Sequence, residues 1–404
     1  MSIHVYPSTT QTVQFGGASV DAFGRLQVAN PYTIFDSQNR YQTNSYFDSS
    51  TSTGGTVTYL PNESSLALAV TTASGSEVVR QTYRSFAYQP GKGLLILITF
   101  CMNAGKTNLR QRIGYMSTQN GVYFEQDGAT LNFVIRSYIS GAVVETRVAQ
   151  SSWNTDKFDG TGASGITLDP SKAQIFWTDI EWLGVGSVRC GFTINGVNYI
   201  CHQFNNANLA TSVYMTTAIL PIRYEITNTG TTASASTLKQ ICCSVISEGG
   251  YEKQTMPQVA RRTTSLTGIG TTFLPLVSIR LASGRTGAVV LPDGHSLLPL
   301  TAGDYEMGMF KNATLTGDSF AATSSTNVEY DVTATAMTGG TQLTSEFFSA
   351  TNQSASVGGV ATDYNFDLQL GATIAGVSDI YTLAIRSISG TNSVIGSLSF
   401  YDLT

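Results

Sequence analysis

The chain has 404 residues with a net charge of −5, and only 12% of them are charged, about half the usual share for globular proteins. This length allows two or three domains, each large enough to bury its own core. The acidic balance, without a basic stripe, argues against nucleic-acid binding. No apolar run approaches the roughly 20 residues that cross a bilayer, and the first residues show no secretory signal. We therefore expect a soluble protein that is made in a cytoplasm and contacts neither nucleic acid nor membrane.

The first thirty residues are polar and contain glycine, with a short apolar patch around Phe23 and Leu26. Asn30-Pro31 marks a break, because the residue before a proline is pushed to extended geometry. We predict a short N-terminal attachment arm over residues 1–30.

Residues 31–248 carry strand signals at intervals near ten residues, which is typical of an all-β sandwich. Asp127-Gly128 predicts a two-residue hairpin turn that would place Phe124 opposite Leu131.

Residues 174–208 are typical of three consecutive strands. Two-residue alternation puts Trp177, Asp179 and Glu181 on one side, opposite an apolar set. Asn195-Gly196 then supplies the two positive-φ residues that a type I′ hairpin requires.

The pairing of two of the five cysteines depends on the turn at Asn195-Gly196. This turn would place Cys190 opposite Cys201, within the distance that a disulfide tolerates. Cytoplasmic synthesis favours free thiols, so the sequence leaves this bond open.

The segment from Asp179 to Gly184 resembles the active strand of laminarinase-type glycoside hydrolases, a concanavalin-like family with a Glu-x-Asp-x-Glu pattern. Glu181 matches the general acid of that pattern and Asp179 its assisting aspartate. Trp177 stands where the nucleophile belongs, and an indole cannot attack an anomeric carbon. The resemblance therefore predicts a concanavalin/lectin-like jelly-roll sandwich, and the mismatch predicts no hydrolysis.

A glycine-containing loop holds three aspartates, Asp156, Asp159 and Asp169. Carboxylate oxygens are ligands for calcium, but the spacing fits no EF-hand, and Asp-Gly pairs are ordinary turn formers. We predict no cofactor and no metal, with calcium at these aspartates as the alternative.

Aromatic side chains are candidates for contacts with a sugar or a partner protein. Tyr123, Trp153 and Tyr199 could stack on sugar rings or serve protein interfaces. The strand face of Trp177, Asp179 and Glu181 is a further possible glycan or interface contact. The sequence does not separate the two uses.

The strand pattern fails near Gly249, and Pro257 and Arg261-Arg262 follow. We predict a linker over 249–265 and a second, smaller β-sandwich over 266–404.

Residues 21–37, DAFGRLQVANPYTIFDS, resemble the DAFGRLRVS-x-P-x-T-x-FDS opening of a family of tailed-bacteriophage virion proteins. Further similar segments lie at 153–162, 182–186, 202–205, 220–226, 275–281 and 312–317. The resemblance implies a non-enzymatic structural protein of the virion.

That resemblance also implies an attachment motif, and it leaves the position on the particle open among capsid decoration, tail, baseplate and fibre. We expect other virion proteins as partners and a homo-oligomer, a trimer or a ring. The rival hypothesis is a glycan-binding adhesin that recognises host surface polysaccharide. The motif residues are Asp21, Phe23, Arg25, Leu26 and Pro31.

Overall fold

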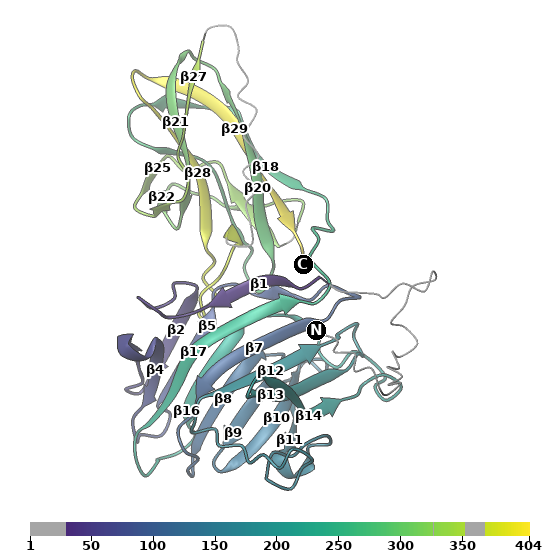
Figure 1. Cartoon of the computed structure of the whole chain (residues 1–404). Helices are drawn as coiled ribbons and strands as arrows, with labels where there is room; N and C mark the ends of the chain where they lie inside the picture. Colours follow the sequence, from purple (N-terminus) through teal and green to yellow (C-terminus); the bar gives the residue numbers. More distant parts are fainter. Residues whose placement is uncertain (1–29, 326, 352–367) are drawn as a thin grey trace, which may run out of the picture.

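A computed structural model describes residues 30–325, 327–351 and 368–404 (Figure 1). Pro31 is exposed and directly precedes the first strand. The other residues of the predicted attachment motif, Asp21, Phe23, Arg25 and Leu26, lie outside the described residues, as does the rest of the arm before residue 30.

The first part of the chain folds into two antiparallel sheets packed face to face. The eight-stranded sheet has the order β14-β13-β12-β7-β17-β4-β3, with β1 also paired to β17. Its strands are β1 (Tyr32–Ser37), β3 (Thr56–Leu60), β4 (Ser65–Val70), β7 (Leu94–Cys101), β12 (Gln174–Ile180), β13 (Val188–Ile194), β14 (Val197–Phe204) and β17 (Ser236–Ser247).

The seven-stranded sheet has the order β11-β10-β9-β8-β16-β5-β2. Its strands are β2 (Phe47–Ser52), β5 (Glu77–Thr82), β8 (Leu109–Met116), β9 (Gly121–Asp127), β10 (Thr130–Ser137), β11 (Val144–Ala149) and β16 (Ile222–Asn228). The short pair β6 (Phe86–Ala87) and β15 (Ile219–Leu220) and the 3-10 turns η1 (Pro61–Glu63) and η2 (Gln150–Ser152) complete this part.

The core between these two sheets is aromatic. Phe124 of β9 lies 5.2 Å from Phe192 and 5.9 Å from Phe100, measured between ring centroids, so the rings of the facing sheets meet directly. Trp153 stacks on Phe133 at 4.2 Å. The predicted all-β sandwich is confirmed, since every regular element of the described residues is a strand or a 3-10 turn. None of the described segments forms a helix with the length and apolar character needed to span a bilayer.

The β9–β10 hairpin differs from its predicted register by two residues. Phe124 pairs with Phe133, and the turn is Gly128-Ala129 instead of Asp127-Gly128. Gly128 has φ +59°, and a glycine with positive φ at the first turn position is what a type II′ hairpin requires. The prediction that placed Phe124 opposite Leu131 was therefore wrong.

The β13–β14 hairpin turns at Asn195-Gly196, as predicted, with φ of +51° and +78°. A bulge after Gly191 then shifts the pairing, so Cys190 lies opposite His202 instead of Cys201. Both thiols are free, and both pack as buried apolar side chains in the core.

The second part is also a β-sandwich with its own apolar core. A three-stranded sheet has the order β18-β29-β20, and the other sheet has the order β23-β24-β19-β28-β21-β26 with β27 on β21. The strands are β18 (Gln258–Ile269), β19 (Leu274–Leu281), β20 (Val290–Pro299), β21 (Gly303–Lys311), β22 (Thr314–Thr316), β23 (Ala321–Ala322), β24 (Val328–Asp331), β25 (Ala336–Thr338), β26 (Thr341–Gln342), β27 (Glu346–Ala350), β28 (Ile380–Ser387) and β29 (Asn392–Asp402).

The connection between the sandwiches is shorter than the predicted linker, 249–265. Strand β18 begins at Gln258 and pairs with β29, so it takes in Arg261 and Arg262. It is an edge strand with mostly exposed side chains, and this polar composition is what made it look like a linker.

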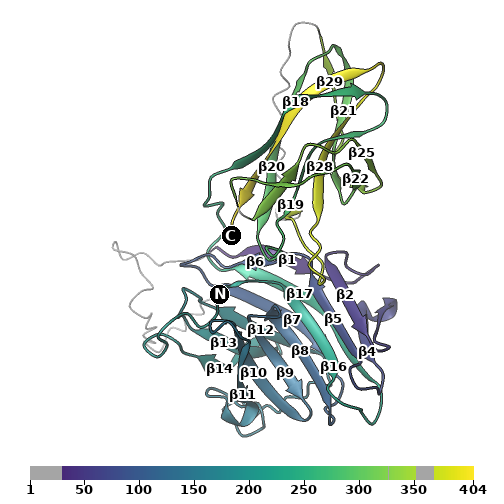
Figure 2. The ribbon, with the colours of Figure 1, turned by 180° about the vertical axis from the view of Figure 1, so that it is seen from behind.

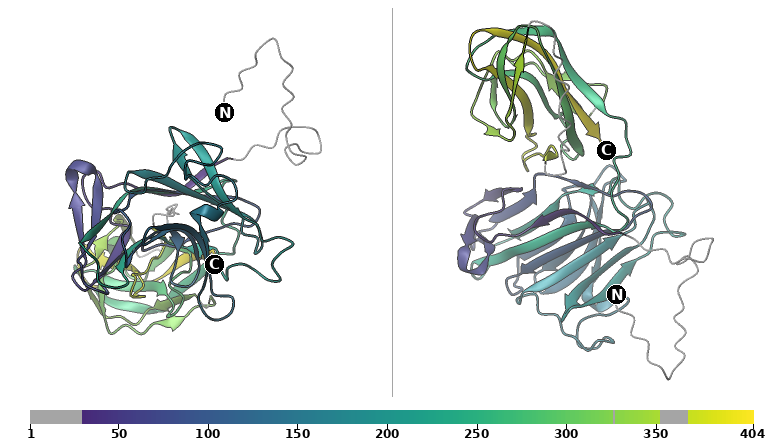
Figure 3. Two further views of the ribbon diagram at one scale, coloured as in Figure 1. Left: turned by 90° about the horizontal axis from the view of Figure 1, so that it is seen from below. Right: turned by 45° about the horizontal axis from the view of Figure 1, so that its top comes forward.

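The second sandwich stands end-on upon the first, at the edge marked by β1 and β17 (Figures 1 and 2). The segment before β28 makes the joint: the Gln369 side chain donates to the Ser85 carbonyl at 2.7 Å, and the Ala372 amide donates to the Tyr83 carbonyl at 2.8 Å. The Ile374 amide donates to the Asp48 carboxylate at 2.8 Å. The same end-on contact is seen from above in Figure 3 (right).

Candidate functional site

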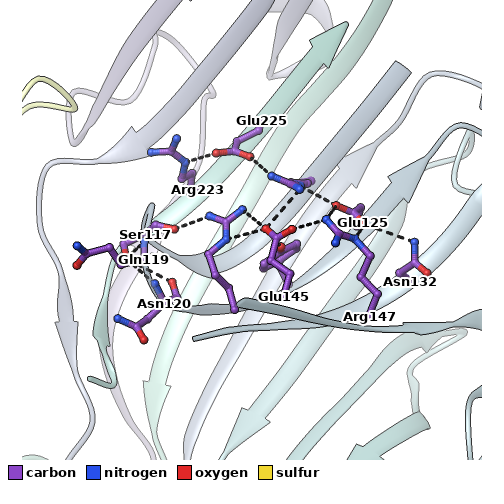
Figure 4. Close-up of polar contacts among 12 residues, drawn as sticks. Ser117, Gln119, Asn120, Glu125, Asn132, Glu145, Arg147, Arg223 and Glu225 are labelled. Atoms are coloured by element: carbon purple, nitrogen blue, oxygen red, sulfur yellow. Dashed lines mark hydrogen bonds and ion pairs between the residues drawn. The ribbon is translucent and has the colours of Figure 1, made fainter. Parts of the chain in front are cut away.

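The outer face of the seven-stranded sheet carries an unusual concentration of charge. In β16, Ile222, Tyr224 and Ile226 face the core, so alternation turns Arg223 and Glu225 outward. Strands β8 to β11 add further outward charges (Figure 4). We call the connected set the arginine–glutamate lattice; it comprises Arg112, Glu125, Arg136, Glu145, Arg147, Arg223 and Glu225.

Glu125 is the centre of the lattice, and its side chain is 0% exposed. It accepts from Arg112 at 2.7 Å and from Arg147 at 2.7 Å, while Asn132 donates to it at 3.4 Å. Arg112 also lies 3.5 Å from Glu225. A buried carboxylate is tolerated only when it is paired and hydrogen-bonded, and here both oxygens of Glu125 are occupied.

The Glu145 carboxylate is likewise held by hydrogen bonds and ion pairs, from residues of β9, β10 and β11. It accepts from the Tyr123 hydroxyl at 2.7 Å and from Arg136 at 2.9 Å, and it pairs with Arg147. The Tyr123 ring lies between the guanidinium groups of Arg112 and Arg136, at 5.5 and 5.0 Å from its centroid. Burial alone would raise the pKa of Glu145, but the Tyr123 hydrogen bond and the two arginines outweigh it and lower this pKa to about 2.

A pocket of about 430 Å³ lies where one end of the lattice meets the second sandwich. At that end Arg223 donates to Glu225 at 2.5 Å and to Gln81 at 2.7 Å. The pocket is lined by Gln81, Tyr83, Ser85, 117–120, Thr217, 219–221, Arg223, 284–288, Asn327, 372–374, Gly376 and Thr404.

The pocket wall is made mostly of hydroxyl and amide groups. Asn120 is fully engaged, because it donates to Thr216 at 2.7 Å and accepts from the backbone amides of Thr216 and Tyr138. This holds the 117–120 turn in place and leaves Thr118 and Gln119 exposed at the rim. The arrangement can offer many neutral hydrogen bonds, together with the cationic side chains of two arginines.

Sequence reasoning missed both the lattice and the pocket, although a signal for the lattice was present. Arg223 and Glu225, like Glu145 and Arg147, are opposite charges two residues apart within a strand, in a chain where only 12% of residues are charged. Alternation therefore places each pair on one face. The pocket had no such signal, because its walls come from segments that the sequence does not link.

Trp177 and Asp179 lie on the outer face of the other sheet, as alternation predicted, but neither is open to a ligand. Trp177 is 5% exposed, and its ring packs so closely over Gly191 that a Cβ there would lie 2.8 Å from it. Asp179 is 4% exposed and forms an ion pair with Arg189. Both were predicted as possible glycan or interface contacts, and this is corrected because they are buried. Glu181 is exposed just beyond the end of β12 and remains a possible contact.

Glu248, which no pattern indicated, lies beside Asp179. Both side chains cross the space above Gly93, where a Cβ would lie 2.3 Å from Glu248 Oε2 and 3.5 Å from Asp179 Oδ1. Burial raises the pKa of Glu248, and the neighbouring Asp179 charge raises it further. Burial likewise raises the pKa of Asp179, against the opposing effect of Arg189.

Of the remaining aromatic candidates, Tyr123 is 0% exposed within the lattice, and the other two belong to the core instead of the surface. Trp153 is 2% exposed and donates its indole N–H to the Val148 carbonyl at 3.1 Å, so its prediction as a contact residue was wrong. Tyr199 is half-buried and packs edge-on against Phe158 at 5.6 Å.

The three loop aspartates cap separate turns. Asp156 accepts from the Phe158 and Ser164 amides. The other two make the same kind of short-range contact, Asp159 with Thr161 and Asp169 with Ser171. Across the described ranges, no three His, Cys, Asp or Glu side chains gather as a metal site would require.

No family model and no curated protein matches this chain. Among solved structures it is similar to the GH16 protein of the Bacteroides ovatus mixed linkage glucan PUL (10% identity, 52% of this chain and 99% of that chain, TM-score 0.37). It is also similar to the CBM2 module of the evolved Dit of Lactobacillus casei BL23 phage J-1 (7%, 56% and 100%, 0.36). A third similar structure is peanut lectin (12%, 54% and 98%, 0.31). Each match covers a little over half of this chain.

From the ion pairs of the lattice we predict an effect on the free energy of unfolding. Glu125→Gln leaves Arg112 and Arg147 without their shared buried charge, so we expect the first sandwich to lose about 3–5 kcal/mol of unfolding free energy. Glu63→Gln, which breaks the exposed pair with Lys239, should cost at most about 1 kcal/mol. Denaturant unfolding followed by tryptophan fluorescence measures this, because all three tryptophans lie in the first sandwich. Equal losses in the two variants would contradict the lattice account.

The lowered pKa of Glu145 predicts how the stability of the fold changes with pH. Its pKa is about 2 in the folded chain against an ordinary 4.5, so the ionised carboxylate stabilises the fold above pH 4.5, and this contribution is lost as pH falls toward 2. We therefore expect the stability gap between wild type and Glu145→Gln to shrink as pH falls from about 5 to about 3. A gap that stays constant or widens over this range would show that the Glu145 carboxylate is not held as described.

Proposed function

We propose that this chain is a non-enzymatic structural protein of a tailed-phage virion, displayed on the particle surface and attached through its N-terminal arm. The observation that carries the proposal is the resemblance of residues 21–37 to the opening of such virion proteins. The last six residues of that motif, Tyr32–Ser37, form strand β1, so the motif joins the arm directly to the folded body.

Specific contacts hold Asn30 and strand β1, where the proposed arm joins the folded body. An attachment point needs such fixed contacts. In β1, the Phe35 ring stacks on Phe86 at 4.9 Å between centroids, and the Arg84 guanidinium lies 5.3 Å from the centroid of the Phe35 ring. The Gly250 amide donates to the Asn30 carbonyl at 2.7 Å. The proposed arm would therefore start close to the joint between the sandwiches. If the arm docks on a partner protein, it would fix the orientation of both sandwiches.

The geometry around Glu181 supports the non-enzymatic part of the proposal. Retaining glycoside hydrolysis needs two carboxyl groups about 5–5.5 Å apart across an accessible bond. Here an indole stands at the nucleophile position, Asp179 is buried against Arg189, and only Glu181 is exposed.

The chain should therefore release no reducing ends from β-glucans. Wild type and Glu181→Gln should both give the rate of a buffer blank in a reducing-sugar assay. Turnover that disappears in Glu181→Gln would refute the non-enzymatic assignment.

The arm makes a prediction about assembly. Deleting residues 1–30 should abolish incorporation into particles while both sandwiches stay folded, because strand β1, which pairs with β17, begins at Tyr32 and is kept. Arg25→Ala should weaken incorporation, whereas Arg40→Ala, an exposed arginine outside the motif, should not. Immunoblots of purified particles measure incorporation, and circular dichroism checks the fold. Particles that carry the deleted chain at wild-type levels would refute the docking role.

Recognition of a host surface glycan is the second candidate function. The observation that favours it is the polar pocket between the sandwiches, whose hydroxyl and amide lining matches the chemistry of a sugar. This function is compatible with a structural role, since a surface protein of a particle can also bind its host.

A further inference from the structure

We propose that the pocket between the two sandwiches binds an acidic oligosaccharide, with Arg285 contacting the acidic group. The inference rests on the second candidate function, and it names the ligand class and the residue that selects it.

The charge of the pocket differs from that of the chain. The chain has a net charge of −5, yet the lining contains Arg223 and Arg285 and no Asp or Glu side chain. Asp48 and Asp379 lie outside the lining but close enough to Tyr83 to raise its pKa after burial has done so. Asp48 accepts from the Ile374 amide, and Asp379 pairs with Lys311 at 3.0 Å. Because Glu225 pairs with Arg223, the open charge in the lining is the Arg285 guanidinium, which favours an anionic group.

The two arginines of the pocket differ in whether their guanidinium groups are already paired. Arg223 is 7% exposed and its guanidinium is engaged by Glu225 and Gln81, so it belongs to the wall. Arg285 is exposed on the loop between β19 and β20, and its side chain makes no ion pair with any described residue. A guanidinium with open donors is suited to a carboxylate, which it can bind with two parallel hydrogen bonds.

The rest of the lining suits sugar hydroxyls better than an apolar molecule. Thr118 and Gln119 are exposed on the rim formed by the first sandwich, while Thr286 and Thr373 come from the second. The half-buried Tyr83 adds an aromatic ring between them. Hydroxyl and amide groups both donate and accept, as sugar hydroxyls do. The volume of about 430 Å³ falls in the usual range of roughly 300–1,000 Å³ for small-molecule sites.

The walls are held in place before any ligand arrives. The joint hydrogen bonds from Gln369 to Ser85 and from Ala372 to Tyr83 fix one wall, and Asn120 fixes the 117–120 turn. A preformed site loses less conformational entropy on binding than a mobile one.

The test is isothermal titration of the full chain with trigalacturonic acid, a trisaccharide of uronic acids, and with neutral maltotriose as the comparison. We expect binding of the acidic sugar with a Kd between about 10 μM and 1 mM, weakened at least about tenfold by Arg285→Gln. Arg261→Gln, an exposed arginine of the same sandwich outside the pocket, should bind like wild type. Gln119→Ala should weaken both sugars, since it removes a neutral contact.

Three results would overturn the inference: no heat of binding at about 10 mM sugar, equal affinity for maltotriose, or the same affinity in Arg285→Gln and Arg261→Gln. Incorporation of Arg285→Gln into particles separates this inference from the structural role. We expect wild-type incorporation, because Arg285 lies outside the attachment motif; loss of incorporation would assign Arg285 to assembly and overturn the ligand site.

Discussion

Three hydrogen bonds at the joint fix how the two halves of this molecule work together. They run from the segment before β28 to Asp48, Tyr83 and Ser85 of the first sandwich. They hold the second sandwich against the first, so that the polar pocket keeps a wall from each. Because this joint lies beside β1, the proposed attachment arm would start close to both sandwiches.

The arginine–glutamate lattice shows how a protein with few charges uses them. In the first sandwich, the seven-stranded sheet gathers buried ion pairs around Glu125 and Glu145. Such pairs contribute little net free energy compared with apolar side chains of similar size, yet removing one partner is costly. The lattice therefore makes this face rigid and specific, and at one end it supplies Arg223 to the pocket wall.

The sequence predicted the parts of this structure that depend on local pattern. Alternation placed Trp177 and Asp179 on one face, and Asn195-Gly196 identified a hairpin, because both signals act within a few residues. It could not reveal the bulge beside Gly191, which moved Cys201 out of register, since a bulge depends on packing against the partner strand.

Exposure was also hard to predict. Trp153 looked like a surface aromatic because its loop is rich in glycine and aspartate, but the loop folds back and its indole stacks on Phe133. The site between the sandwiches was out of reach for the same reason: Gln81, Gln119 and Arg285 come together only through the tertiary fold.

The central claim is that this sandwich pair is a building part of a virus particle, with a rigid body and a docked arm. Quantitative mass spectrometry of particles purified from a phage that carries the coding sequence of this chain would test it most directly. The account predicts that the chain is present in many copies per particle, in a fixed ratio to the other structural proteins. Its absence from purified particles, or trace amounts that vary between preparations, would contradict the account.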